Sequence, residues 1–321
     1  MYDYEVNDYA PVLVTGFNRP EFLEDQIQYL LRMGCKVYVS LDIPEPGDSN
    51  NREPSRRCKS LVEYYSNELA AVRISTKNLG CYRGVTEAIT WAFGKEESII
   101  ILEDDVRVNE AFLLFATTML QVFEENKSVG SIAGANFVPK SHLTHIDEQV
   151  RFSAFTSSWG WATWRNRWQD YLTDIDTFPI LDFTFPENFW GYMSKKYWVK
   201  IFEDTKNGKY DAWDYRWLYS NWKRKRLTLV PNANLVLNIG FGAGATHTQD
   251  SKLPWWLPRE IDQSFQVRDI QKIALRDTRA DHWMKENHFR MKLNQQLRAS
   301  FSRQFPQTAH LYRKLLEKIS E

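Results

Sequence analysis

The sequence predicts an α/β fold in which helices cover both faces of a mixed, mostly parallel sheet, with a C-terminal helical extension. Short apolar segments alternate with amphipathic segments through the first 135 residues, and short turns separate them. The apolar run at residues 99–102, within SIIILEDDVRV (98–108), is typical of a strand buried on both faces. Three acids follow it directly at positions 103–105. They indicate either a ligand site at the carboxyl end of a strand or an ordinary acidic turn.

The bulk composition excludes several classes of protein. Of the 321 residues, 41 are basic and 41 acidic, so net charge gives no support for nucleic-acid binding. No run approaches the roughly 18 apolar residues of a membrane span, and residues 1–10 do not resemble a secretory signal. Cys35, Cys58 and Cys81 are too few and too scattered for a disulfide framework or a zinc site. We therefore expect a cytoplasmic protein.

The strands and helices are predicted from the spacing of apolar residues and from the residues that begin or end each segment. Strands are expected at residues 11–15, 36–41, 71–75, 99–102 and 131–135, and helices at 21–33, 61–69, 85–93 and 110–125. Gly34 and Gly94 end two of these helices, and Asn109 is a good N-cap for the last one. The stretch 43–55, rich in Pro, Asp, Asn and Ser, is predicted to be a surface loop.

Polar side chains recur where the predicted strands end. The set comprises Arg19, Asp42, Asn78, Glu103, Asp104 and Asp105, and Arg83 is grouped with it. Because these strand ends meet at one edge of the sheet, the residues are expected to face a single crevice. No glycine-rich phosphate loop of either common type is present. A nucleotide would therefore be bound by side chains and a divalent cation, Mn²⁺ or Mg²⁺, which prefers oxygen ligands.

The second half of the chain is dense in tryptophan. Nine of the 13 tryptophans lie between residues 159 and 222. Aromatic rings of this kind form either a core or a cleft for flat sugar faces, and Trp159, Trp161 and Trp213 are the candidates for contacts to an acceptor.

Asp214 lies between Trp213 and Tyr215, where partial desolvation favours a raised pKa and a role as general base. The alternative is an N-cap for the helix that follows, in which case Asp211 is the next candidate for the base. A predicted strand leads into the glycine-rich segment 235–248, which contains His247. This histidine is either a loop residue or a metal or phosphate ligand.

The tail from residue 261 to 321 is expected to be helical and auxiliary. Its last part, 290–318, combines a basic face with an apolar stripe, as in a packing helix or in a helix that contacts an anionic membrane surface. The predicted division is a nucleotide-binding half at 1–136, an acceptor-binding half at 137–253 and a helical tail at 254–321. The first two are expected to share one sheet.

At this point a family resemblance can be stated. The chain resembles GT-A fold glycosyltransferases, in particular relatives of N-acetylglucosaminyltransferase I and bacterial surface-polysaccharide transferases described as haemolysin-like. The resemblance covers roughly residues 11–248. It is carried by the segments FNRP (17–20), SLD (40–42), the strand with EDD (99–105), SSWGWATW (157–164), WD (213–214) and NIGFGAGATHT (238–248).

The resemblance implies a role for each of several residues. Asp105 would bind the metal that bridges the donor diphosphate, Asp104 would contact the ribose, and Glu103 the donor sugar. Asp42 would bind the nucleotide base, with Arg19 close by. Asp214 would be the base of an inverting transfer from a nucleotide-diphosphate sugar, with UDP expected as the nucleotide, to a glycan or glycolipid hydroxyl.

Two other classes of function fit parts of the pattern. A nucleotidyltransferase on a similar sheet would use metal-binding carboxylates, but GFNRP (16–20) is a poor version of its glycine- and lysine-bearing loop. A non-catalytic carbohydrate-binding protein would explain the aromatic residues but not the intact EDD.

Overall fold

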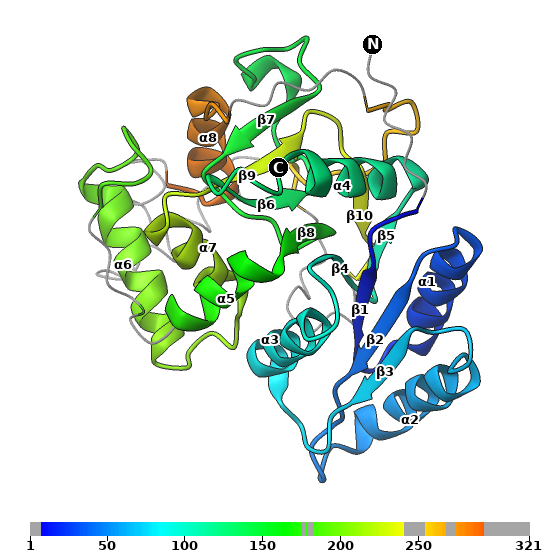
Figure 1. Ribbon diagram of the computed structural model, residues 1–321. Coiled ribbons are helices and arrows are strands. Elements are labelled where there is room, and N and C mark those ends of the chain that lie inside the picture. Colours follow the sequence, from blue (N-terminus) through cyan, green and yellow to red (C-terminus); the bar gives the residue numbers. More distant parts are fainter. Residues whose placement is uncertain (1–7, 175–177, 179–182, 241–253, 268–273, 292–321) are drawn as a thin grey trace, which may run out of the picture.

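The computed structural model describes residues 8–174, 178, 183–240, 254–267 and 274–291 (Figure 1). Its centre is an eight-stranded sheet in the order β3-β2-β1-β4-β8-β6-β9-β7. The strands are β1 (Val12–Gly16), β2 (Val37–Leu41), β3 (Ala71–Ile74), β4 (Ser98–Glu103), β6 (Val129–Ala133), β7 (Val150–Ser153), β8 (Trp161–Trp164) and β9 (Leu227–Pro231). A second, two-stranded sheet pairs β5 (Val106–Val108) with β10 (Val236–Asn238).

The large sheet is mixed. Strands β3, β2, β1 and β4 are parallel to one another, and β6 is parallel to β9. Strand β8 is antiparallel to both of its neighbours, β4 and β6, and β7 is antiparallel to β9. One continuous sheet therefore runs through the two predicted halves of the chain, as expected from the sequence.

Helices cover both faces of the sheet (Figure 1). They are α1 (Pro20–Arg32), α2 (Ser49–Tyr64), α3 (Gly80–Phe93), α4 (Glu110–Val122), α5 (Arg165–Asp174), α6 (Tyr192–Lys206), α7 (Asp214–Lys223) and α8 (Thr278–Trp283), with short turns of helix at Lys140–His142 and Met284–His288. On β4, Ile100 and Leu102 pack with α1, α2 and α4, whereas Ile99 and Ile101 pack with α3, α5 and α7. The alternation confirms that this strand is buried on both faces.

Three predicted segments differ from the structure, and one of them is the helix expected at 61–69, because α2 ends at Tyr64. The stretch 43–55 is not all loop, because α2 begins at Ser49, where the side chain of Asp48 accepts a hydrogen bond from the N–H of Asn51. The helix contains Pro54 and buries only Ser55, Cys58 and Val62, of which the first is polar, so its buried face carries a weak apolar signal in the sequence. Residues 261–267 form no helix, and 292–321 lie outside the described residues, so the expectations for the tail beyond 291 stay predictions.

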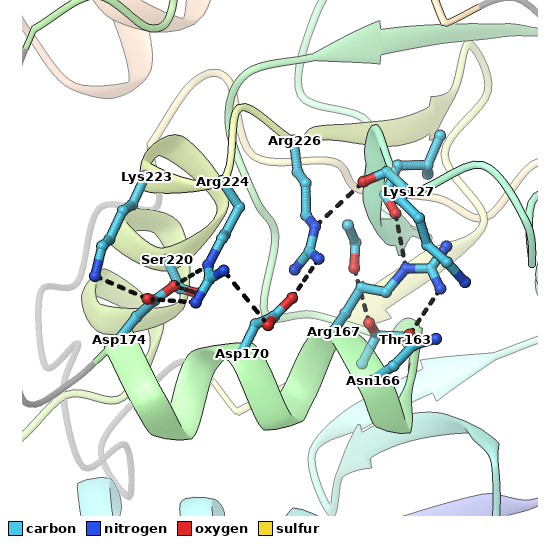
Figure 2. Close-up of polar contacts among 12 residues, drawn as sticks. Lys127, Thr163, Asn166, Arg167, Asp170, Asp174, Ser220, Lys223, Arg224 and Arg226 are labelled. Carbon is cyan, nitrogen blue, oxygen red and sulfur yellow. Dashed lines mark hydrogen bonds and ion pairs between the residues drawn. The ribbon is translucent and has the colours of Figure 1, made fainter.

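A group of ion pairs built around the buried Asp174 and Arg226 joins α5 to α7 and to the segment that follows (Figure 2). This ion cluster consists of Asp170, Asp174, Lys223, Arg224 and Arg226. Both oxygens of Asp174 accept hydrogen bonds from Arg224 at 3.0 Å, and Lys223 lies 2.9 Å away. Asp170 pairs with Arg226. The cluster lies at the C-terminal end of α7, the helix that begins at Asp214.

The second half of the chain builds an aromatic core of its own. Trp198, Trp222 and Phe202 pack together beneath α6, α7 and α8, with ring centroids 4.9–6.0 Å apart. Most of the tryptophan density predicted from the sequence is thus core. Within the described residues, no helix is both long and apolar enough to cross a lipid bilayer.

Candidate active site

A cavity of about 430 Å³ opens at the carboxyl ends of β1, β2, β3 and β4. The residues of the predicted set that line it are Arg19, Asp42, Asn78, Glu103, Asp104, Asp105 and Trp159. The convergence of four strand ends on one crevice is therefore confirmed. It follows from the parallel pairing of these strands, which brings their carboxyl ends to the same edge of the sheet.

The most charged part of the wall is the acidic turn, which we define as Glu103, Asp104 and Asp105. Strand β4 ends at Glu103, and the two aspartates form the turn into β5, each only 5% exposed. Nη1 of Arg19 lies 3.1 Å from Oδ1 of Asp104 and 2.6 Å from Oδ2 of Asp105. Within the described residues, this guanidinium is the only cation ion-paired with the three carboxyl groups.

The acidic turn therefore has an excess of negative charge. Burial, and then repulsion from Asp105 and Asp104, raises the pKa of Glu103 to about 8. The same two causes raise the pKa of Asp104 to about 6, although Arg19 opposes them. Burial also raises the pKa of Asp105, against the influence of Arg19. A further cation at this place would stabilise the ionised carboxylates.

The donor atoms of the acidic turn fit a divalent metal ion. Oδ1 of Asp105 is buried and has no hydrogen-bond partner among the described residues. No group of three His, Cys, Asp or Glu side chains in the described part of the chain forms a complete metal site. Mg²⁺ and Mn²⁺ commonly bind through one or two carboxylates and take their other ligands from phosphate and water. The turn suits that kind of site, whereas a site enclosed by protein ligands is not present in these residues.

The small sheet brings a second segment against Asp105. The N–H of Ile239 donates to the backbone carbonyl of Asp105 at 2.8 Å, directly after β10. A Cβ at Gly240 would lie 1.9 Å from Oδ2 of Asp105, so only glycine allows this close approach. His247, the other predicted metal ligand, lies outside the described residues.

Asp42 and Asn78 shape the opposite wall. The carboxylate of Asp42 accepts hydrogen bonds at 3.1 Å from the N–H groups of Leu79 and Gly80, at the start of α3. Asn78 donates to the carbonyl of Ile43 at 2.6 Å. Arg83, in contrast, is not part of the cavity wall. Its exposed side chain pairs with Glu87 one helical turn further along, so its placement with the nucleotide set is corrected.

The second half of the chain contributes Asp211 to the wall. Its carboxylate accepts hydrogen bonds from the N–H of Cys81 at 2.7 Å and of Tyr82 at 3.0 Å, and so caps α3 from a distant part of the sequence. A Cβ at Gly80, where φ is +71°, would lie 2.6 Å from this carboxylate. In the sequence, Asp211 is noticeable only because it lies in the segment DAWD (211–214). There it ranked second to Asp214 as a candidate for the general base.

Asp214 is the first residue of α7 and is not among the residues that line the cavity. One of its carboxylate oxygens accepts a hydrogen bond from the N–H of Tyr215 at 2.9 Å. Its charge still reaches the acidic turn: after burial and the two aspartates, Asp214 is the next cause of the raised pKa of Glu103. Asp211 therefore lines the cavity itself, whereas Asp214 acts on the acidic turn through its charge.

Two of the three predicted aromatic contacts are core residues. Trp161 is 0% and Trp213 3% exposed, and their rings stack at 5.2 Å with an interplanar angle of 19°. Both pack with Trp168 and Trp217 between α3, α5 and α7. The expectation that Trp161 and Trp213 offer a surface to an acceptor is corrected by this burial. Trp159 is half-buried and lines the cavity, and its contact with an acceptor stays a prediction.

Comparison with known proteins gives no family assignment. The chain matches no known family profile, and no curated protein sequence matches it significantly. Among solved structures, residues 1–349 of S. aureus TarS are 14% identical with a TM-score of 0.39, covering 70% of this chain and 59% of that one. The chain thus spans less than two thirds of that structure.

Two further similarities are of the same order. A mannosyltransferase from Pyrobaculum calidifontis, in complex with GDP-Man and Mn²⁺, is 14% identical with a TM-score of 0.34, covering 55% of this chain and 51% of that one. The glycosyltransferase GlyE of Streptococcus pneumoniae is 12% identical with a TM-score of 0.27, covering 58% and 41%. Such similarities are too low to transfer a function.

Proposed function

We propose that this protein is a metal-dependent glycosyltransferase that moves a sugar from a nucleotide-diphosphate donor to a glycan hydroxyl. The observation that carries the proposal is the acidic turn at the end of β4, where three carboxyl groups share one arginine inside a cavity of about 430 Å³. Buried carboxylates without matching cations are costly, and a metal bound to a diphosphate would offset that cost. UDP is proposed as the donor nucleotide because of the resemblance of the sequence to GT-A fold glycosyltransferases.

Each wall of the cavity has a role in this proposal. Asp105, with Asp104 beside it, would ligate the divalent ion, which when bound supplies positive charge to the leaving diphosphate. Arg19 adds a second positive charge at the same place. Glu103, at the end of β4 on the cavity wall, would form a hydrogen bond with a hydroxyl group of the donor sugar. Asp42 and Asn78 would flank the nucleotide.

We assign the general base of an inverting transfer to Asp214 rather than to Asp211. Both oxygens of Asp211 already accept backbone hydrogen bonds at the start of α3, so this residue has a structural task as a cap. Asp214 lies at the first turn of α7, and its charge acts on Glu103. A base in this position would take the proton of the acceptor hydroxyl as the new glycosidic bond forms and the bond to the diphosphate breaks.

The donor site is tested by thermal unfolding with UDP and Mn²⁺, each alone and together. The pair should stabilise the wild-type protein by mass action, by about 2.7 kcal/mol at 100 times Kd. Asp105→Asn should lose this stabilisation. Glu53→Gln, which changes an exposed acid on α2, is the matched control. This variant should keep the stabilisation by UDP and Mn²⁺. If UDP and Mn²⁺ together do not stabilise the wild-type protein, the donor site is contradicted. If Asp105→Asn binds UDP with Mn²⁺ as tightly as the wild type, the assignment of Asp105 as metal ligand is contradicted.

The base is tested by slow donor hydrolysis, measured over a panel of UDP-, GDP- and dTDP-sugars. Asp214→Asn should lower kcat by about 10²–10⁴-fold with little change in donor KM. Asp211→Asn should lower the melting temperature but keep most of kcat, because it removes a helix cap. The reverse pattern would move the base to Asp211. Release of nucleoside monophosphate and sugar 1-phosphate, in place of nucleoside diphosphate and free sugar, would identify a nucleotidyltransferase instead.

A further inference from the structure

A second cavity, of about 400 Å³, lies between the segment after β6 and the segment 254–260. Aromatic and polar side chains line it together, among them Phe137, Trp255, Trp256, Arg259 and Glu260. None of the residues predicted from the sequence to bind donor or acceptor belongs to it. Its aromatic walls and its position beside the candidate active site distinguish it from the other surface hollows of the described structure.

Trp255 is exceptional among the tryptophans. All 13 lie in the described residues, and Trp255 is the one that is largely exposed, at 69%. Its ring contacts Trp283 in a T-shaped pair at 5.7 Å, which fixes the indole at the rim of the cavity. Exposing so large an aromatic ring sacrifices hydrophobic stabilisation that the other tryptophans of this chain provide. An exposed and anchored ring of this kind points to a ligand.

A row of aromatic rings connects the second cavity to the candidate active site. Phe137, on the wall of the second cavity, forms T-shaped pairs with Trp159 at 5.3 Å and with Trp256 at 5.6 Å. Trp159 in turn lines the active-site cavity. The ring of His288 packs against both Phe137 and Trp256, with ring centroids 5.0 Å and 4.3 Å apart. The two cavities are therefore neighbours with one shared aromatic wall.

The floor of the second cavity is rigid. The side-chain amide of Asn136 donates to the carbonyls of Val138 and Asn232, and that of Asn234 to the carbonyls of Val236 and Glu260. These bonds tie the segment after β6 to the segment 254–260. A site that is already formed loses little conformational entropy when a ligand binds.

We propose that the second cavity binds a sugar unit of the acceptor chain, beyond the unit that receives the transferred sugar. This inference rests on the proposed function. The apolar C–H face of a pyranose ring would pack on Trp255, and the exposed side chains of Arg259 and Glu260 would bond its hydroxyl groups. One charge of each sign suits a neutral sugar better than an anionic bilayer, which would select a basic patch.

The test measures binding of neutral tetrasaccharides of glucose, mannose, galactose and N-acetylglucosamine by saturation-transfer NMR, with no donor present. The wild-type protein should bind at least one of them, and Trp255→Ala should weaken that binding about 10-fold or more. Trp255→Phe, which keeps an aromatic ring, should restore most of it. Tyr64→Ala is the matched control, since Tyr64 is 77% exposed on α2, and its affinity should equal that of the wild type.

Thermal stabilisation by UDP with Mn²⁺ is measured on the same four proteins, which are the wild type, Trp255→Ala, Trp255→Phe and Tyr64→Ala. This measurement separates the sugar subsite from the proposed function. If the pair stabilises all four alike while sugar binding depends on Trp255, both proposals are supported. If the pair stabilises them but no tetrasaccharide binds, or binding ignores Trp255, the sugar subsite is wrong and the donor site stands. If the sugar binds through Trp255 but UDP and Mn²⁺ do not stabilise the protein, the protein is a carbohydrate-binding protein and not a transferase. Adhesion to phosphatidylglycerol vesicles through Trp255 without sugar binding would overturn the subsite in favour of a membrane contact.

Discussion

Two buried groups of acids in this molecule have opposite charge balance. The acidic turn contains three carboxyl groups, and Arg19 is the one cation ion-paired with them in the described structure. The ion cluster between α5 and α7 contains two carboxylates and, within the same described residues, three cations (Figure 2). Both groups lie at the end of a regular element next to the sheet.

The pKa of Asp174 in the ion cluster and the pKa values of the acidic turn are shifted in opposite directions. The pKa values of Glu103, Asp104 and Asp105 are all raised, with burial as the largest cause. Burial opposes ionisation at Asp174 as well, but hydrogen bonds from Arg224, Lys223 and Ser220 outweigh it and lower its pKa. Hydrogen-bond donors within reach of the carboxylate thus separate Asp174, which joins two helices, from the acids of the turn, which have a single ion-paired cation in the described structure.

The largest expected effect is on stability when a carboxylate of the ion cluster is removed. Asp174→Ala removes the buried carboxylate that Ser220, Lys223 and Arg224 contact. Because water can solvate the two cations, whose side chains are 33% and 37% exposed, the loss should be that of charged hydrogen bonds, about 1.5–3 kcal/mol of unfolding free energy. Asp105→Asn should change it by less than about 1 kcal/mol in EDTA, because it removes one of three mutually repelling groups. Urea unfolding of both variants measures the difference, and equal losses would mean that the acidic turn is structural too.

A smaller effect is expected from pH. The raised pKa of Glu103, about 8, means that the folded protein holds a proton which the unfolded chain releases near pH 4.3. The unfolding free energy of the wild type should therefore fall as pH rises from 5 to 8 with EDTA present. Glu103→Gln removes the part of this dependence that comes from Glu103, while Asp104, with a pKa of about 6, still contributes. The variant should therefore gain about 1–2 kcal/mol over the wild type at pH 8 and almost nothing at pH 4.

Asp174 provides the opposite control. Its pKa is lowered, so its contribution is complete above about pH 4 and disappears as pH falls through its folded pKa. The stability difference between the wild type and Asp174→Asn should thus be constant from pH 5 to 8 and shrink in stronger acid. Urea titrations at each pH measure both trends. A Glu103→Gln protein whose gain does not grow with pH would show that the acidic turn is already compensated.

The same comparison explains how far the sequence alone could predict this molecule. The run at 99–102 followed by EDD predicted both the central strand and the acidic crevice, because a buried strand and its end are encoded within a few neighbouring residues. Parallel pairing then placed Arg19, Asp42 and Asn78 at the same edge. These parts of the site depend on local pattern and on a general rule of sheet geometry.

The parts that failed depend on distant partners. Nothing near Trp161 or Trp213 in the sequence reveals that the two rings stack on each other in the core. The capping of α3 by Asp211 joins residues 130 positions apart. Helix α2 was missed because Pro54 and its polar neighbours are typical of loops, although three buried side chains suffice to attach it to the sheet. Trp255 gave no local sign that it would be the exposed tryptophan.

The smallest expected effect concerns redundancy within the ion cluster. Asp174 accepts hydrogen bonds from Arg224 at 3.0 Å and from Ser220 at 2.9 Å, and Lys223 lies 2.9 Å away. Arg224→Gln therefore leaves two partners, and because the side chain of Arg224 is 37% exposed, the loss should be only about 0.5–1 kcal/mol. Arg56→Gln, in an exposed pair on α2, is the matched control and should cost less than about 0.5 kcal/mol. Urea unfolding at pH 7 ranks the two. A loss in Arg224→Gln as large as in Asp174→Ala would mean that Asp174 depends on a single cation, as the acidic turn depends on Arg19, and the contrast between the two groups would disappear.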